Sequence, residues 1–228
     1  MIELHYFRHS RSHRVLWFLE ELQVSYNLVI HDRDPETQLA PKSAKQIHPL
    51  GKFPIVIDNG LVLAESAVIL EYLARSYGAP DWVYETSDSE YWSFQYWMHY
   101  AEASLMPPLI IRLVLSVLKG EQIPLMVRPI SRRLADGIDR NFTKPQITTH
   151  FEFVDKHLAS HSWFVGDHIS IADVQMHFPL EAALAKNTIR PEQYPNVATY
   201  VSRIHERPAY LRALKKAGGY DFGPRDDT

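Results

Sequence analysis

Three groups of residues in the first third of the chain have the types and spacing of a site for a small peptide. Ser66 directly precedes the apolar residues of a predicted helix, and we expect it to be the N-cap. Its hydroxyl and the N–H groups of the first turn form a site for a carboxylate. Lys52 supplies a cation for a second carboxylate, and Glu65 supplies an anion for an amine. The alternative is a β-hairpin that leads into an ordinary capped helix.

A proline at the start of a predicted strand provides a further contact for a peptide. Pro54 precedes the apolar residues 55–57, which the turn 58–60 (Asp-Asn-Gly) joins to residues 61–63 as a hairpin. Proline has no N–H to donate to a strand ladder. With a cis bond between Phe53 and Pro54, the backbone of Phe53 is free to pair with an extended peptide.

Hydrophobic periodicity around these residues predicts a compact α/β unit. Residues 3–7 and 26–30 are predicted strands, and residues 10–22 are a predicted helix with Glu20 and Glu21 on its outer face. A strand, a helix and a strand, followed by a hairpin and a helix, is the order of elements in a thioredoxin-like fold. Such a fold has a four-stranded sheet with helices packed against it.

The rest of the chain has a helical pattern. We expect an α/β domain over residues 1–78, a linker over residues 79–87 and an all-α domain over residues 88–228. Pro107 and Pro108 are expected to kink or end a helix. The predicted helices cover residues 91–105, 110–118, 125–142, 145–157, 195–206 and 209–214, and residues 218–228 are expected to fray.

Composition argues against several kinds of partner. The 228 residues carry a net charge of −3, which gives no electrostatic case for nucleic acid. We find no run of about twenty apolar residues that would predict a membrane span, and no signal peptide pattern at the start. With no cysteine and no His-Glu-x-x-His motif, we expect no metal site. A reducing cytoplasm is the expected location.

Four motifs resemble the cytosolic glutathione S-transferases, in particular serine-type members of fungi and bacteria. They are His9-Ser10-Arg11, Ile-His-Pro-Leu-Gly-Lys-Phe-Pro over residues 47–54, Glu65-Ser66, and Glu-x-Ser-Leu-x-Pro-Pro-Leu over residues 102–109. Ser170 and Asp173 fit a capping box ahead of an apolar helix, as in the C-terminal domain of that family, where the box is a folding element. The resemblance covers nearly the whole chain. It implies a thioredoxin-like N-terminal domain and an all-α C-terminal domain.

The resemblance also implies glutathione as a substrate. In the family the proline is cis, and the Glu-Ser pair holds the γ-glutamyl end of the tripeptide. Lys52 and His48 are candidates for the glycine carboxylate, and Arg11 for positive potential near the sulfur. The implied glutathione-binding residues are Ser10, Arg11, His48, Lys52, Phe53, Pro54, Glu65 and Ser66.

A hydroxyl is the expected partner of the glutathione sulfur. A thiol reacts as the thiolate, and its free pKa is about 8.5. Ser10, placed four residues before Arg14 as in serine-type members, is expected to donate a hydrogen bond to the sulfur at the start of the first helix. Tyr6 is the rival, because tyrosine-type members place a phenol at the end of the first strand, and Ser12 is the third candidate. An ordinary N-cap is the alternative role of Ser10, and a half-buried strand aromatic that of Tyr6.

The second substrate is expected to be a small hydrophobic electrophile bound between the domains. Glu102 either reaches a ligand or is an interfacial charge. Part of the aromatic block in residues 91–100 is expected to lie in a homodimer interface, because one helix face cannot bury all of it. The candidates for the electrophile pocket are Leu109, Ile111, Arg112 and Leu115.

These expectations combine into one predicted function and its alternatives. We predict a glutathione S-transferase that conjugates glutathione to an electrophile, with reduction of organic hydroperoxides as a second reaction to test. The first alternative is a non-catalytic glutathione-binding or stress-response interaction protein with the same fold. Disulfide reduction that uses only bound glutathione also stays open, because the chain has no catalytic cysteine.

Overall fold

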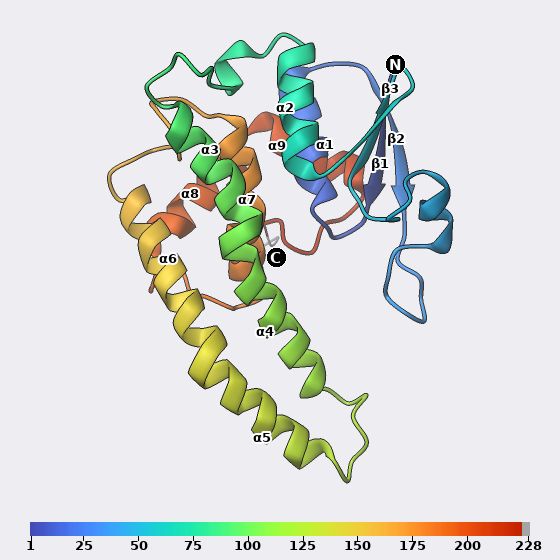
Figure 1. Cartoon of the computed structure of the whole chain (residues 1–228), viewed down its shortest axis with the longest axis vertical. Helices are drawn as coiled ribbons and strands as arrows, with labels where there is room; N and C mark the ends of the chain where they lie inside the picture. The colour runs from blue at the N-terminus through green and yellow to red at the C-terminus, as the bar shows by residue number, and fades with distance from the viewer. Residues whose placement is uncertain (225–228) are drawn as a thin grey trace.

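The N-terminal part of the protein is a four-stranded sheet with helices packed against it (Figure 1). The computed structural model describes residues 1–224. The strand order is β2-β1-β3-β4, in which β1 and β2 run parallel and β3 is antiparallel to both of its neighbours. This arrangement confirms the predicted thioredoxin-like fold. Its elements are β1 (Ile2–Phe7), α1 (Ser12–Leu22), β2 (Tyr26–His31), β3 (Ile55–Asp58), β4 (Leu61–Ala64) and α2 (Ser66–Ser76).

The register of the strands brings three chain segments to one edge of the sheet. His5 of β1 pairs with Ile55 of β3, and Ile55 pairs with Ala64 of β4. The predicted hairpin turn is present, with Asn59 and Gly60 at φ 49° and 85°, the left-handed conformations that these residues tolerate. The end of β1, the start of β3 and the end of β4 therefore meet where the candidate binding residues lie.

The C-terminal part is all helical among the described residues, as predicted. Helix α1 packs against α7 and α9, and α2 also packs against α7. Figure 1 shows α4 and α5 extending away from the rest of the molecule as a long hairpin. The helices are α3 (Tyr91–Tyr100), α4 (Met106–Leu118), α5 (Arg128–Ile138), α6 (Lys144–Leu158), α7 (Ile171–Ala185), α8 (Pro195–His205) and α9 (Pro208–Ala217).

Prolines do not interrupt the two longest helices, contrary to expectation. A π-helical segment, Ala101–Leu105, joins α3 to α4 just before Pro107 and Pro108. Another, Asp139–Thr143, joins α5 to α6, so the helices expected over residues 125–142 and 145–157 are one. Proline lacks an N–H and clashes with the carbonyl four residues earlier. In both places the wider π turn lies where that conflict would arise, so the helix continues through it.

One helical stretch, Tyr91–Leu118, is long and apolar enough to cross a membrane by length and composition alone. It has 28 residues, and 28% of its most apolar window is buried. The stretch also carries Glu102, which is ion-paired with Arg11 and Arg14 of the N-terminal part. The buried residues of this stretch pack against the rest of the fold, which accounts for part of its apolar composition.

Helix α1 is buried on nearly all sides, and Glu20 does not lie on an outer face as expected. Its carboxylate is 6% exposed and accepts hydrogen bonds from Lys216, Arg212 and Tyr26. Glu21, which is partly exposed, pairs with Arg207. The polar face that periodicity predicted for α1 does not face solvent, because α9 and its N-cap residue Arg207 cover it.

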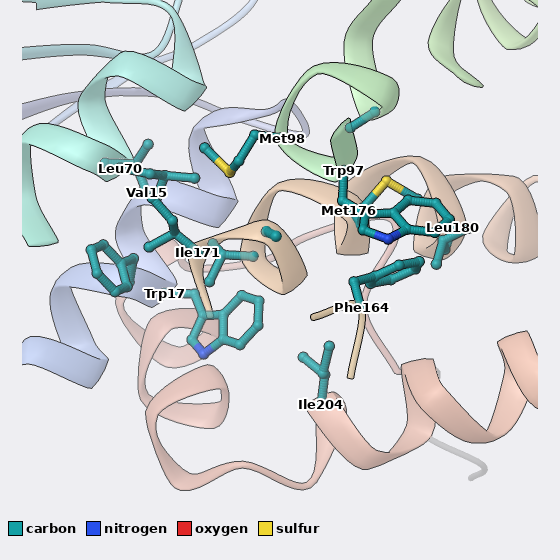
Figure 2. Close-up of a cluster of buried hydrophobic side chains, with 14 of the residues drawn as sticks. Val15, Trp17, Leu70, Trp97, Met98, Phe164, Ile171, Met176, Leu180 and Ile204 are labelled. Atoms are coloured by element: carbon teal, nitrogen blue, oxygen red, sulfur yellow. The ribbon is translucent and has the colours of Figure 1, made fainter. Parts of the chain in front are cut away.

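The hydrophobic core is shared by both parts of the chain. Figure 2 shows Val15 and Trp17 of α1 in one cluster with Ile171 of α7, and labelled side chains of α2, α3 and α8 surround them. Because each fully buried large apolar side chain stabilises the fold by roughly 1.5–3 kcal/mol, this joint core holds the two parts in a fixed relation.

The predicted capping box at the start of α7 is present and buried. Ser170 is the N-cap, and the Asp173 carboxylate accepts a hydrogen bond from the Ser170 N–H at 2.9 Å. Its other oxygen accepts from the Phe164 N–H and from the Tyr200 hydroxyl, both at 3.0 Å. Asp173 thus joins α7, α8 and the preceding loop, which supports a structural role for it.

We predict that Asp173→Asn lowers the free energy of unfolding by about 3 kcal/mol, because an amide NH₂ would face buried donors that need an acceptor. Urea denaturation followed by circular dichroism measures this loss. The control is Asp167→Asn, at an exposed position of the same loop, which should change stability by less than about 0.5 kcal/mol. Equal stability of the two variants would contradict the role given to Asp173.

Candidate active site

Ser10 lies in the short loop between β1 and α1. Its Oγ donates to the Phe7 carbonyl at 2.6 Å and accepts from the Ser12 N–H at 3.1 Å. The helix begins at Ser12, two residues later than expected. Arg11 occupies the N-cap position, but its side chain makes no capping hydrogen bond. Ser10 and Arg11 both line a cavity, so the uncapped end of α1 lies beside it.

The two rivals of Ser10 lie outside that cavity. Tyr6 is fully buried, and its hydroxyl faces His13 Nδ1 at 3.4 Å. Burial raises the pKa of the Tyr6 phenol above its usual value, and Glu181 adds to this effect. Ser12 is also fully buried, and its Oγ accepts from the Phe7 N–H at 3.1 Å. Its hydroxyl therefore holds the end of β1 in place.

The peptide-binding residues predicted around the hairpin gather at the edge of the sheet. The Phe53–Pro54 bond is cis. Because Ile55 pairs with Ala64, Pro54 and Glu65 follow as neighbours in the same register. Glu65, not Ser66, is the N-cap of α2, with φ 71° and no side-chain cap. Ser66 is the first helical residue and is buried, so its hydroxyl lies inside the first turn together with uncapped N–H groups.

The two candidates for the glycine carboxylate are placed differently. Lys52 is exposed and lines the cavity, next to Phe53. His48 is half-buried at the end of a 3₁₀ turn, where its Nδ1 accepts from the Leu50 N–H at 3.4 Å. His48 is not among the residues that line the cavity.

The cavity lies between the two parts of the chain and has a volume of about 580 Å³. Leu109 and Arg112 line it as expected, but Ile111 and Leu115 do not. The lining side of α4 includes Leu109 and Leu113, one turn apart, whereas Leu115 is 5% exposed and packs elsewhere. Other lining residues, which the sequence did not point to, are Arg33, Met106, Phe178, Ala182, Lys186, Thr188 and Phe222.

Arg11 does not act as a free cation beside Ser10. Its Nε lies 3.1 Å from both oxygens of Glu102, and Arg14 Nη1 lies 3.0 Å from the same carboxylate. Burial alone would raise the pKa of Glu102, but Arg14 and Arg11 outweigh it and hold this pKa below its usual range. Arg14 also donates to Gln175 of α7 at 2.6 Å. Glu102 is therefore an intramolecular partner that fixes α1 against the C-terminal part.

The described part of the C-terminal tail is ordered by contacts and does not fray as expected. Tyr220 stacks on His13 with ring centroids 3.9 Å apart, and its hydroxyl donates to Glu181 at 2.9 Å. The Asp221 N–H donates to His9 Nδ1 at 3.1 Å, and Phe222 forms part of the cavity wall. Residues 225–228, which belong to the same expectation, lie outside the described residues.

A buried polar cluster underlies this tail. His177, Glu181 and His205 have the ligand types of a metal site, and their ligand atoms lie within 4.8 Å of one another. Sequence spacing did not predict this group, because α7 and α8 meet only in the fold. The Glu181 oxygens already accept hydrogen bonds from Tyr210 and Tyr220, and His205 lies within hydrogen-bond distance. We therefore describe the cluster as a hydrogen-bonded network.

The fold and this site define a class of protein: a thioredoxin-like domain joined to a helical domain, with a cavity between them. The family model for the glutathione S-transferase N-terminal domain matches residues 1–75, and the C-terminal one matches residues 130–208. Glutathione S-transferase 3 of Schizosaccharomyces pombe is 37% identical over 216 residues, which are 95% of this chain and 88% of that protein. The chain belongs to the glutathione S-transferase family.

Solved structures agree with this assignment. A glutathione S-transferase from Actinobacillus pleuropneumoniae superposes with a TM-score of 0.79 at 33% identity, over 96% of this chain and 94% of that one. A sphingomonad glutathione S-transferase, solved in complex with glutathione, has a TM-score of 0.74 at 20% identity. It covers 95% of this chain and 98% of its own.

Burial of His13 beneath the tail makes stability depend on pH. Burial lowers the pKa of His13 to about 3, although Glu181 acts to raise it. In the unfolded chain His13 takes up a proton near pH 6.5, so below that pH the unfolded state binds more protons. We predict that the free energy of unfolding falls by about 2 kcal/mol from pH 7 to pH 5 through this residue.

Urea denaturation of the wild type and of His13→Gln at both pH values measures this dependence. The variant cannot titrate there, so its stability should change less between pH 7 and pH 5, whatever its stability at pH 7. His168→Gln, at an exposed position, should keep the slope of the wild type. An unchanged slope in His13→Gln would mean that His13 is charged in the folded protein.

Proposed function

We propose that this protein is a glutathione transferase that uses Ser10 to hold the glutathione sulfur as a thiolate for attack on an electrophile. The observation that carries the proposal is that Ser10, Lys52 and Phe53 line one cavity, whose opposite wall is mainly apolar. That arrangement suits a peptide thiol on one side and a second substrate on the other.

Each end of glutathione has a matching group in this proposal. The first turn of α2, with Ser66 and its N–H groups, accepts the γ-glutamyl carboxylate, and Glu65 pairs with the amine. Phe53, held by the cis bond to Pro54, pairs its backbone with the cysteinyl residue. Lys52 attracts the glycine carboxylate. We leave His48 out of this set because its Nδ1 already accepts a hydrogen bond from the Leu50 N–H.

The chemical step needs a small movement of Ser10. Its hydroxyl donates to the Phe7 carbonyl at 2.6 Å, and rotation of that hydroxyl redirects the hydrogen bond to the sulfur. Together with the uncapped start of α1, this donor lowers the pKa of the bound thiol. The thiolate then forms a carbon–sulfur bond with the electrophile. In a substitution the leaving group departs with its bonding electrons, and in an addition the resulting carbanion takes a proton from water. We also propose a cytoplasmic location, with which the absence of cysteine is compatible, and a role in detoxification.

We predict that Ser10→Ala lowers kcat with 1-chloro-2,4-dinitrobenzene by about 100-fold. A loss of this size is typical when one hydrogen bond that stabilises an anion in an active site is removed. The KM for glutathione should stay within a few-fold, because the tripeptide keeps its other contacts. The pKa of the bound thiol, followed by the ultraviolet absorbance of the thiolate, should rise toward the free value.

Tyr6→Phe is the comparison variant, and it should keep most of the activity because its hydroxyl does not reach the cavity. Full activity in Ser10→Ala combined with loss in Tyr6→Phe would reverse the assignment. Retention on immobilised glutathione without turnover of this electrophile or of cumene hydroperoxide would favour the non-catalytic binding protein. Turnover of glutathione-mixed disulfides alone would favour disulfide reduction.

We also propose a homodimer formed through the aromatic block of α3. Phe94, Trp97 and Tyr100 are buried, but Trp92 is 78% exposed and Tyr96 48% exposed. They continue into an apolar surface with Phe153 of α6, which contacts Tyr96. The N-terminal part has its own exposed apolar side chains, Leu61, Val62 and Val68, so the two surfaces of a pair of chains complement each other.

We predict that Trp92→Glu converts a dimer of the wild type into a monomer, because it places a charge in the apolar surface. Light scattering coupled to gel filtration measures the mass. Leu211→Glu, at another exposed apolar position on α9, should leave the dimer intact. A monomeric wild type, or a dimer that tolerates Trp92→Glu, would rule out this interface.

A further inference from the structure

The charged side chains that line the cavity are all positive. Among residues 1–224, its lining includes several arginines and lysines but no aspartate or glutamate. Glu102 neutralises Arg11, and the proposed function uses Lys52 for glutathione. Arg33, Arg112 and Lys186 remain. Arg33 donates to the carbonyls of Gln38 and His9 on the N-terminal side of the cavity. Arg112 and Lys186 come from the helical part, and glutathione, as we propose it to bind, needs neither. A cavity lined by cations attracts and orients an anionic ligand.

Arg112 and Lys186 both lie at the turn that follows α7. Arg112 Nη1 donates to the carbonyl of Thr188 at 3.2 Å, so the guanidinium of α4 lies against the turn that follows α7. Lys186 is the C-cap residue of α7, two residues before Thr188. Both side chains and Thr188 line the cavity.

Helix α7 sets the distance between this turn and the reactive end. Phe178, Ala182 and Lys186 are spaced by four, so they follow one face of the helix along the cavity. The ring of Phe178 lies 5.6 Å from the guanidinium of Arg11, next to Ser10. At 1.5 Å per residue, Lys186 is about 12 Å further along the axis. An elongated ligand can reach both ends.

The surface between the two ends is apolar. Phe222 packs edge-to-face on Phe178 with ring centroids 5.7 Å apart, and Leu109 lies on the α4 side. The ammonium of Lys186 lies 5.1 Å from the Phe222 ring and has no carboxylate partner in the described part of the chain. The closest carboxylate oxygen to Arg112, on Asp139, is 3.9 Å away. Arg112 thus has a long ion pair and a carbonyl partner, whereas Lys186 has no carboxylate partner among the described residues and is the cation more available to a ligand.

We propose that the second substrate is an amphipathic anion, with an aromatic or aliphatic body against Phe178 and Phe222 and a carboxylate at Arg112 and Lys186. This inference rests on the proposed transferase function and replaces its neutral hydrophobic electrophile. The reaction itself is unchanged: for an enone, the thiolate sulfur bonds to the terminal alkene carbon, and the resulting enolate takes a proton from water. The carboxylate only binds.

Ethacrynic acid and its methyl ester test the proposal. Both are the same aryl enone, and the carboxyl group lies on an oxyacetic arm across the ring from the reacting carbon. Esterification therefore removes the charge with little effect on intrinsic reactivity. We expect the wild type to have a kcat/KM about tenfold higher for the acid than for the ester, the factor of one charge-assisted contact. The ratio should shrink as salt is raised.

Variants of Lys186 show whether this residue carries the preference. Lys186→Gln should lower the acid-to-ester ratio about tenfold, and Lys186→Arg should retain it. Arg112→Gln should act in the same direction. Lys215→Gln, an exposed lysine near the end of α9, should leave the ratio unchanged. If Lys186 only stabilised the C-terminal end of the α7 dipole, its substitution would change stability but not the acid-to-ester ratio.

Parallel assays separate failure of this inference from failure of the proposed function. The two compounds are also measured as inhibitors of 1-chloro-2,4-dinitrobenzene turnover, so the comparison stands even if neither is conjugated. Turnover with no preference for the acid, or a preference that survives in both Lys186→Gln and Arg112→Gln, overturns the anion site alone. Absence of glutathione binding and of any turnover overturns the transferase proposal and the anion site with it.

Discussion

The burial of α1 is the constraint on which the rest of the structure depends. Residues 12–20 are all buried, and three of them are ionisable. A buried charged group must find partners or lose its charge. Arg14 finds Glu102 and Gln175, and Glu20 finds Arg212 and Lys216 on α9. These partners come from the C-terminal half, so the loop with Ser10 is held by both halves of the chain.

That burial also explains the order in the end of the chain. His13 stays neutral under Tyr220, whose hydroxyl bonds to Glu181 of α7. The tail then passes over the entrance of α1, and Phe222 becomes a wall of the cavity. Residues 218–224 are thus held by contacts of Tyr220, Asp221 and Phe222 together. The shape of the cavity therefore depends on a polar cluster outside it.

Charge is distributed unevenly across the cavity, and this sets the chemistry at each end. Near Ser10, Glu102 offsets Arg11, so the serine hydroxyl and the uncapped start of α1 are the groups that we propose to face the sulfur. At the far end, Lys186 has no such partner among the described residues. In the proposed mechanism, directed donors hold the thiolate, and a strong cation beside it would reduce its nucleophilicity through a lower pKa. Lys186 lies where we propose that an anionic substituent binds.

Local signals in the sequence determined the fold class and pointed to the residues that we propose to bind glutathione. The Asn-Gly hairpin, the proline before β3 and the capping box of Ser170 and Asp173 each depend on a few neighbouring residues, so they can be read from order alone. Only the tertiary structure decided that Tyr6 is buried, that the prolines of the long helices are absorbed by π turns, and which residues face the cavity. Phe178, Lys186 and Phe222 carry no local pattern, because α7 and the tail meet α1 and α4 only after the shared core has packed. Side chains that must act together across that core are determined by packing, which periodicity along one helix does not contain.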